Sequence, residues 1–243
     1  MALNAVYRDI PPFIDGYGAT TEKLFSGAFA RTPNGFRCGA RIRARKPGDG
    51  TKFFGDIKGA ISASGLGSGM TISFHHHMRN GDHIVNLVMD ACAQMGIRDL
   101  TIFPTALFDV HKKIIPHIKS GVIKRIMGSV NGPIGQLVSE GGMEIPVVLR
   151  SHGGRPRAVI SGDVHIDVAF IAAPTADIEG NISGRVGKSA CGSIGYAFTD
   201  AEYADCVIAI TDNLQNYPIA PVSIPGTCVD FVTQVGAIGD PSG

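Results

Sequence analysis

The chain has 243 residues, a formal net charge of +1 and a sequence pI of about 7.7, which allows one large domain or two small ones. The near-neutral charge does not suit a nucleic-acid-binding protein, no apolar run approaches membrane-spanning length, and the first residues lack the order of a signal peptide. Five scattered cysteines without a C-x-x-C pair favour a reducing, cytoplasmic location over a disulfide framework or a zinc knuckle.

Residues 1–55 differ in composition from the rest of the chain. They are rich in proline, glycine and aromatic residues, and they carry a basic run of Arg37, Arg41, Arg43, Arg45 and Lys46. We predict an irregular N-terminal extension over residues 1–55 and an α/β domain over residues 56–243. The basic run is interpreted equally well as a partner-facing arm or as a solvated loop.

The first predicted elements form a strand, helix, strand unit. After a short helix at 54–64, apolar and polar residues alternate through 70–74, as in a strand. From Ile84 to Met95 the apolar residues recur with the period of a helix, and Gly96 suits its C-terminal stop. Asn80 or Asp82 could cap this helix at its start. The run at 100–103 is the next strand.

The rest of the chain continues the alternation. We predict helices at 107–118 and 133–139, and strands at 122–126, 145–149, 166–172, 206–210 and 229–235. The 166–172 run is almost continuously apolar, which is typical of a parallel strand buried on both faces. The fold class is therefore α/β, with a mostly parallel sheet flanked by helices.

A basic cluster follows the 70–74 strand, and it is the first candidate for a ligand site. We predict substrate contacts there from His75, His77, Arg79, Asn80 and Gly81. A strand end that leads into a helix suits an anion, because helix N-terminal N–H groups converge there. A metal site is disfavoured, because neighbouring residues of a strand face opposite ways and no carboxylate follows at ligand spacing. Buried structural histidines remain an alternative.

Three further clusters come just after predicted strands. They add the candidate substrate contacts Arg150, His152, Gly153, Gly154, Asn181, Lys188 and Ser189. Arginine offers a fork for carboxylate or phosphate. The Gly187-Lys188-Ser189 sequence is not a P-loop, since Ile182 stands where the first glycine would be required. A solvated hairpin tip would explain the cluster around Arg150 alone, but the clusters together predict an electropositive cleft for a small polycarboxylate. No catalytic residue is assigned.

These motifs resemble the citrate lyase alpha-subunit family. The similarity is carried by Gly69–Asp82, Val148–Gly154, Gly187–Ser193 and Thr211–Leu214, with support from Ile10–Pro12 and Gly16–Gly18. More distantly, Asp167–Ala172, Asp177 and Gly180-Asn181 are similar to the amino-terminal half of coenzyme A transferases. The resemblance implies a CoA-transferase-like fold, which is related to that of sugar-phosphate isomerases.

The resemblance also implies a reaction and its partners. Such a subunit exchanges the acetyl group on an acyl-carrier protein for citrate, releasing acetate, within the cleavage of citrate to oxaloacetate and acetate. It holds no cofactor itself and acts on a dephospho-CoA-type prosthetic group of the gamma (acyl-carrier) subunit, while a beta subunit cleaves the citryl thioester. An oligomer without nucleic acid or membrane is expected.

The resemblance covers only the amino-terminal half of such a subunit. A similarly folded C-terminal half is therefore an expected partner, and this chain alone is expected to be incomplete as an enzyme. Two alternatives stay open. The chain could belong to another carboxylate CoA-transferase or a sugar-phosphate isomerase, or it could be a non-catalytic assembly module that docks the carrier and lyase subunits.

Overall fold

The computed structural model describes residues 2–3, 9–14, 18–19, 51–75 and 78–242. Within the first 50 residues it contains the short antiparallel pairs β1 (Ala2–Leu3) with β2 (Asp9–Ile10) and β3 (Phe13–Ile14) with β4 (Gly18–Ala19). The basic run from Arg37 to Lys46 and the side chains of His76 and His77 lie outside the described residues. The predicted boundary at residue 55 stays a prediction.

Seven parallel strands form the main sheet among the described residues. Their order is β5 (Phe53–Phe54), β16 (Phe231–Gln234), β14 (Cys206–Thr211), β11 (Val168–Ala173), β6 (Thr71–His75), β7 (Leu100–Pro104) and β9 (Ile123–Ile126). This confirms the predicted α/β class with a parallel sheet.

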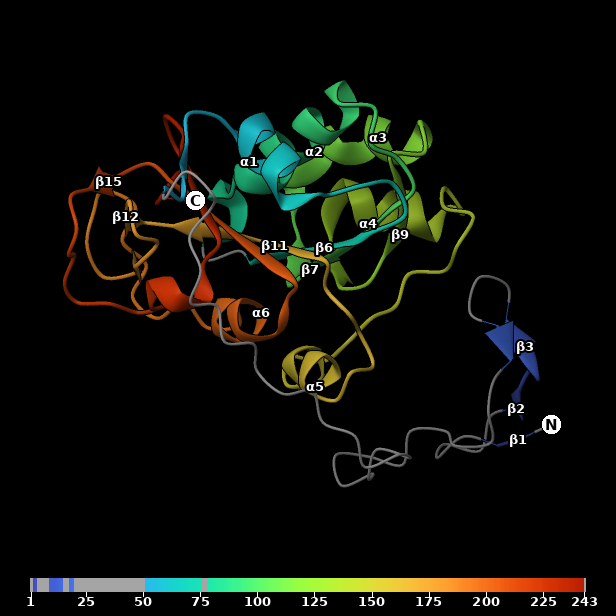
Figure 1. The fold of residues 1–243 in the computed structure, drawn as a ribbon. Coiled ribbons are helices and arrows are strands. Elements are labelled where there is room, and N and C mark those ends of the chain that lie inside the picture. Colours follow the sequence, from blue (N-terminus) through green and yellow to red (C-terminus); the bar gives the residue numbers. More distant parts are fainter. Residues whose placement is uncertain (1, 4–8, 15–17, 20–50, 76–77, 243) are drawn as a thin grey trace.

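Helices cover both faces of the sheet (Figure 1). One face carries α1 (Ile57–Ser64), α2 (Ile84–Gln94), α3 (Ile115–Lys119) and α4 (Gly132–Ser139). The other face carries α5 (Gly154–Ile160) and α6 (Ala197–Tyr203). Beyond one end of the sheet lies a small second sheet of β12 (Thr175–Asp177), β13 (Ile182–Ser183) and β15 (Leu214–Gln215).

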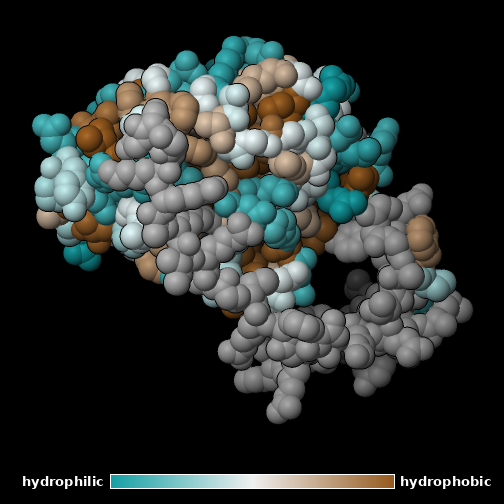
Figure 2. All heavy atoms as spheres, viewed as in Figure 1, coloured by the Kyte–Doolittle hydropathy of each residue, from teal (hydrophilic) through white to brown (hydrophobic). Residues whose placement is uncertain are grey.

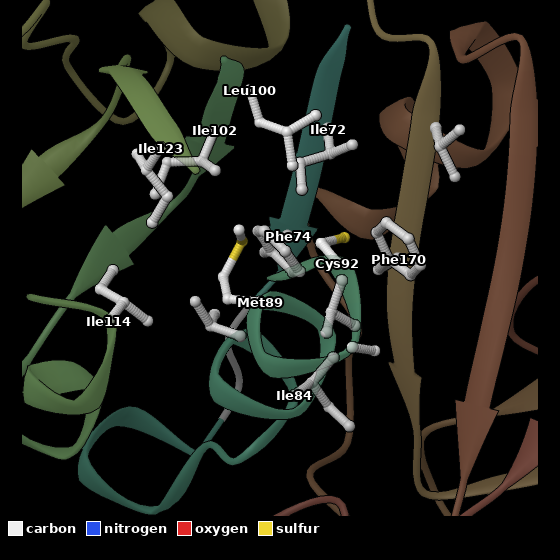
Figure 3. Close-up of a cluster of buried hydrophobic side chains, with 14 of the residues drawn as sticks. Ile72, Phe74, Ile84, Met89, Cys92, Leu100, Ile102, Ile114, Ile123 and Phe170 are labelled. Atoms are coloured by element: carbon white, nitrogen blue, oxygen red, sulfur yellow. The ribbon is translucent and has the colours of Figure 1, made fainter. Parts of the chain in front are cut away.

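Strand alternation builds the two apolar layers. Ile72 and Phe74 of β6 point toward α2, and Phe74 stacks on Phe170 at a centroid distance of 5.6 Å (Figure 3). Because side chains alternate along a strand, Ser73 and His75 point to the α5 and α6 face. On the outer surface, hydrophilic and hydrophobic residues are interspersed over the visible face of the described part (Figure 2).

Several predicted boundaries are confirmed to within a few residues. Helix α1 begins after Asp56, whose Oδ1 accepts a hydrogen bond from the Gly59 N–H at 2.7 Å. Helix α2 starts where Asp82 Oδ1 accepts from the Ile84 N–H, and the chain leaves it through Gly96 at φ +75°. The N-cap is His83, whose side chain makes no capping hydrogen bond, and not the predicted Asn80 or Asp82; Asp82 lies one residue earlier and still accepts from the first helical N–H.

Two predicted elements differ in the structure. The region 107–118 is not one helix but β8 (Ala106–Leu107), the 3-10 helix η2 (Asp109–Ile114) and then α3, in which Pro116 lies at the start. The predicted strand 145–149 is absent. Only an isolated bridge joins Val148 to Met127, since Pro146 has no N–H for a longer ladder.

The connections reverse direction at the centre of the sheet. From β6 the chain steps outward through β7 to β9, and from β11 it steps outward the other way through β14 to β16. Neighbours β6 and β11 therefore form a topological switch point, where the loops after the two strands diverge. In open α/β sheets, the crevice outside the carboxyl ends of such strands is the usual ligand site.

Candidate functional site

Two predicted residues, His75 and His152, meet at this switch point around a tyrosine. His75 ends β6 and is buried, whereas His152 precedes α5 and is exposed. The ring of Tyr196 lies 6.3 Å from the His75 ring and 5.0 Å from the His152 ring, with interplanar angles of 86° and 71°. Burial raises the pKa of the Tyr196 phenol, and the nearby Arg155 cation opposes that rise.

A buried ion pair lies under this group. Arg155 of α5 donates to both carboxylate oxygens of Asp200 of α6, at 2.8 and 2.7 Å. Its guanidinium also donates to the carbonyl of Phe103 at 2.9 Å and lies 4.3 Å from the centroid of the Phe103 ring. The pair ties α5 and α6 to the carboxyl end of β7. Its charge is satisfied inside the protein, so Arg155 supports the site without being available to a ligand.

Arg150 has a guanidinium nitrogen, Nε, without a hydrogen-bond partner among the described residues. The residue is half-buried, and this nitrogen is itself buried. It follows Leu149, which is 67% exposed and lines a cleft of about 660 Å³ between α4 and residues 143–149. Further along, the Gly154 N–H is already bonded to Ser151 Oγ at 3.1 Å, and Gly153 caps α5.

Lys188 and Ser189 meet a carboxylate instead of forming an open anion site. Ser189 is buried, and its hydroxyl donates to Asp212 Oδ2 at 2.7 Å. Lys188 Nζ donates to the Gly236 carbonyl at 2.9 Å and lies 3.8 Å from the same Asp212 oxygen. Asp212 follows β14 directly, so this loop is held over the carboxyl ends of β14 and β16. The Lys188 side chain remains 59% exposed.

The 79–83 loop is tied to the C-terminal segment. Arg79, Asn80 and Gly81 form the 3-10 helix η1, with Asn80 exposed and Gly81 buried. The Asp240 N–H donates to the Gly81 carbonyl at 2.8 Å, and a side chain at position 81 would collide with the Asp240 backbone. Glycine at this position is therefore required for packing. His77 lies outside the described residues, and the Arg79 side chain is not described.

Buried Asp82 and His111 secure the same loop from the other side. The Phe108 N–H donates to His111 Nδ1 at 2.9 Å, which leaves Nε2 as the protonated nitrogen of a neutral ring. That Nε2 lies 3.1 Å from Asp82 Oδ2 and donates to it. The loop between β6 and α2 is thus fixed to η2.

Asn181 lies between β12 and β13 of the small sheet. Its amide nitrogen donates to Asp177 Oδ2 at 2.9 Å, and its Oδ1 accepts from the Gly226 N–H at 2.9 Å. Both of its polar groups hold the backbone between β12 and β13 in place, so its observed contacts are those of a structural residue.

Sequence reasoning missed Tyr196, Asp212 and the Arg155–Asp200 pair. Asp212 directly follows the buried strand β14. The other candidate residues were selected because they follow strands, so the same reasoning could have predicted Asp212 as a site residue. Tyr196 and Asp200 carry no local signal. Their partners come from β6, from the loop before α5 and from α5 itself, distant positions that only the folded chain brings together.

One group of possible metal ligands occurs within the described ranges, away from this site. His165, Asp167 and Asp205 lie at the amino ends of β11 and β14, with His165 Nε2 at 3.0 Å from Asp205 Oδ2 and 3.7 Å from Asp167 Oδ1. Ion pairing accounts for this arrangement. Of the helices described, none is long and apolar enough to cross a membrane.

The described part of the chain has a CoA-transferase-like fold. A glutaconate coenzyme A-transferase from Acidaminococcus fermentans superposes with a TM-score of 0.58 at 15% identity, covering 75% of each chain, which is a likeness of fold alone. The family model "Citrate lyase, alpha subunit (CitF)" matches residues 50–243. This chain therefore belongs to the citrate lyase alpha-subunit family.

Two relatives give the extent of the similarity. The citrate lyase alpha chain of Klebsiella pneumoniae is 45% identical over 217 residues, which are 86% of this chain and 43% of the relative. The structure of a putative alpha subunit of citrate lyase from Streptococcus mutans, in complex with citrate, matches with a TM-score of 0.84 and 46% identity over 97% of this chain and 45% of that one. The chain thus spans less than half the length of these relatives.

Proposed function

We propose that this chain supplies the citrate-binding part of a transferase that exchanges the acetyl group on an acyl-carrier protein for citrate. The observation that carries the proposal is the 46% identity over 97% of the chain to a Streptococcus mutans subunit whose structure contains citrate. It is supported by the imidazole of His75 at the carboxyl end of β6, where an anion is favoured, and by that of His152, which contacts the same tyrosine. Arg150, two residues before His152, has an Nε without a hydrogen-bond partner among the described residues.

The proposed reaction proceeds through an acyl anhydride. A citrate carboxylate attacks the carbonyl of the acetyl thioester, and the C–S bond breaks to leave the carrier thiolate. The thiolate then attacks the citryl carbonyl of the anhydride, which gives the citryl thioester and free acetate. No proton is consumed, so the route needs orientation of the carboxylate and stabilisation of the oxyanions more than a strong base.

The proposed substrate contacts fall into two groups. His75, Arg150 and His152 are proposed to contact citrate directly, with His77, Arg79, Asn80 and Gly81 from the same loop. Gly153, Gly154, Asn181, Lys188 and Ser189 are proposed to shape the walls, since the observed contacts of several of them are already made within the protein. The identity of a catalytic residue is not part of the proposal.

The proposed partners follow from the family. They are the acyl-carrier subunit with its dephospho-CoA-type group, the lyase subunit, and the remaining length that the relatives possess, in an oligomeric complex. A cytoplasmic location is proposed because the four described cysteines, Cys92, Cys191, Cys206 and Cys228, form no disulfide.

Citrate binding tests the proposed site. Arg150→Ala and Arg79→Ala should each weaken binding in calorimetric titration by about 1.5–3 kcal/mol, the usual contribution of a charge-assisted hydrogen bond. Arg98→Ala is the matched control, because Arg98 is an exposed arginine that precedes β7 at the opposite end of the sheet. If both site variants bind citrate as the parent does, the site lies elsewhere.

Thioester exchange separates the proposal from its rivals. The chain, supplied with the remaining part of the subunit, should exchange acetyl for citrate on the carrier and should not isomerise a pentose phosphate. Exchange with a different carboxylate only would favour another CoA-transferase. Binding of the carrier without any exchange would favour an assembly module.

A further inference from the structure

Tyr196 follows a glycine whose backbone conformation is left-handed. Gly195 has φ +53°, and a Cβ there would lie 3.4 Å from His75 Cε1. A side chain at position 195 would thus be strained by the positive φ, although its Cβ would make only an ordinary contact with the imidazole. The glycine lets the chain pass close to His75 and places Tyr196 at the start of α6, next to the imidazole.

Tyr196 contacts three cationic or ionisable groups from separate elements. Its ring meets the rings of His75 and His152 nearly edge-on, at 6.3 and 5.0 Å, and its centroid lies 6.0 Å from the guanidinium carbon of Arg155. Edge-to-face pairs at these separations are the favoured geometry of aromatic rings. Arg155 is itself fixed by Asp200, so the ring is supported from within the fold.

His152 needs such a support more than His75 does. His75 is anchored at the end of a central strand, whereas His152 is exposed on the loop before α5. The contact with Tyr196 is the interaction recorded for the His152 side chain among the described residues. Without that ring, the spacing between the two imidazoles would no longer be set.

We propose that Tyr196 is a positioning residue that sets the spacing of the His75 and His152 imidazoles so that together they receive the carboxylates of the substrate. The inference rests on the proposed function and deepens it. Tyr196 acts through its ring and not through its hydroxyl, because the contacts with both imidazoles are ring contacts. Phenylalanine should therefore replace it, and an aliphatic residue should not.

Citrate titration of a set of variants tests this assignment. Tyr196→Phe should keep the Kd within about twofold of the parent value, as for a neutral surface change. Tyr196→Leu should raise the Kd about tenfold, near the upper end of what one aromatic pair contributes. His152→Ala should have a similar effect. The citrate Kd of the double variant Tyr196→Leu/His152→Ala should be no higher than that of the weaker-binding single variant, because both changes remove the same positioned His152 imidazole.

Two results would overturn the inference. One is a Tyr196→Leu variant that binds citrate as tightly as the parent. The other is a double variant whose loss equals the product of the single losses, because independent effects multiply. Tyr196→Met serves as a second aliphatic replacement if the leucine variant unfolds, and circular dichroism melting verifies that each variant is folded.

A measurement without citrate separates this inference from the proposed function. The NMR signals of the His75 and His152 imidazole protons, assigned with His75→Ala and His152→Ala, should shift in Tyr196→Leu and stay in place in Tyr196→Phe. Unchanged signals in the leucine variant refute the positioning role even if citrate binds. If the signals shift as expected but the parent chain does not bind citrate, the proposed substrate is wrong, whereas the positioning of the two imidazoles by Tyr196 is retained.

Discussion

At the scale of single residues, the buried Arg155–Asp200 pair should be costly to break by removing one of its partners. Both side chains are almost completely buried, and the guanidinium bonds both carboxylate oxygens and a backbone carbonyl. A buried charge that loses its partner keeps its desolvation cost without compensation. The Arg155 guanidinium also lies against the Tyr196 ring, which in turn contacts His152.

Replacing Arg155 with methionine should lower the free energy of unfolding by about 3–5 kcal/mol, because Asp200 is left buried and unpaired. Urea denaturation followed by circular dichroism measures the loss. The control is Lys124→Met, which removes a pair with Asp99 whose side chains are 51% and 55% exposed. An exposed pair contributes about 1 kcal/mol or less. Equal losses in the two variants would contradict the assigned role of the buried pair.

Cys92 gives a prediction for alkaline pH. Burial raises the pKa of this thiol to about 12, whereas a cysteine in an unfolded chain ionises near pH 8.5. Below the unfolded pKa both states are protonated, and the stability is complete. At a pH between the unfolded and the folded pKa, the Cys92 thiol is ionised in the unfolded chain but protonated in the folded one. The free energy of unfolding therefore falls as the pH rises through this range.

Urea midpoints measured from pH 8 to pH 11 should therefore decline less steeply in Cys92→Ala than in the parent. The alanine variant starts from a lower stability because it leaves a small cavity, so the slopes and not the absolute values are compared. Parallel slopes would show that Cys92 does not contribute to the alkaline loss of stability.

At the scale of elements, α1 depends on its first capping residue. The helix is short, with eight residues from Ile57 to Ser64, and it buries Ala60 and Ile61 against the sheet. The Asp56 carboxylate accepts from the Gly59 N–H and satisfies one of the unpaired amides of the first turn. A short helix has few other sources of stability.

Replacing Asp56 with alanine should lower the free energy of unfolding by about 0.5–2 kcal/mol, the range measured for loss of an N-cap. Asp56→Ser is the matched control, since serine also caps helices and should retain most of the stability. Thermal and urea unfolding report both variants. A serine variant as unstable as the alanine variant would show that the carboxylate acts by some means other than capping.

At the scale of the whole molecule, the sheet has a self-contained layered structure but the chain has less than half the length of its relatives. Helices cover both faces, and the two apolar layers are closed by residues of this chain. The candidate site, by contrast, lies outside these layers, beyond the carboxyl end of the central strand β6. The fold and the activity should therefore have different requirements.

The 243-residue chain should unfold in one cooperative step by itself, yet exchange acetyl for citrate only weakly. Adding the remaining part of the subunit should raise the exchange rate strongly, since fixing the reactants in near-attack geometry lowers a barrier by up to about 7–11 kcal/mol. Sedimentation velocity should be run on the same samples. Rapid exchange by the monomeric chain alone would place the complete site within these residues.

The sequence alone determined much of the local structure, because the relevant signals are local. The apolar runs predicted β11 and β14, the helical period predicted α2, and Gly96 marked its end. His75 and His152 were selected because ligands usually bind at the carboxyl ends of parallel strands. In the structure both imidazoles contact the ring of Tyr196. The prediction of a strand at 145–149 was wrong, because it followed the apolar run and gave too little weight to Pro146 within it, which cannot donate to a ladder.

The tertiary structure decided how these parts meet. Strand order and the switch point between β6 and β11 depend on pairings between residues nearly a hundred positions apart, which no local pattern encodes. Side-chain partners also come from distant positions: Ser189 is bonded to Asp212, and Tyr196 contacts His75 and His152. A sequence shows which side chains can bind an anion, but the fold alone determines which of them already have a partner.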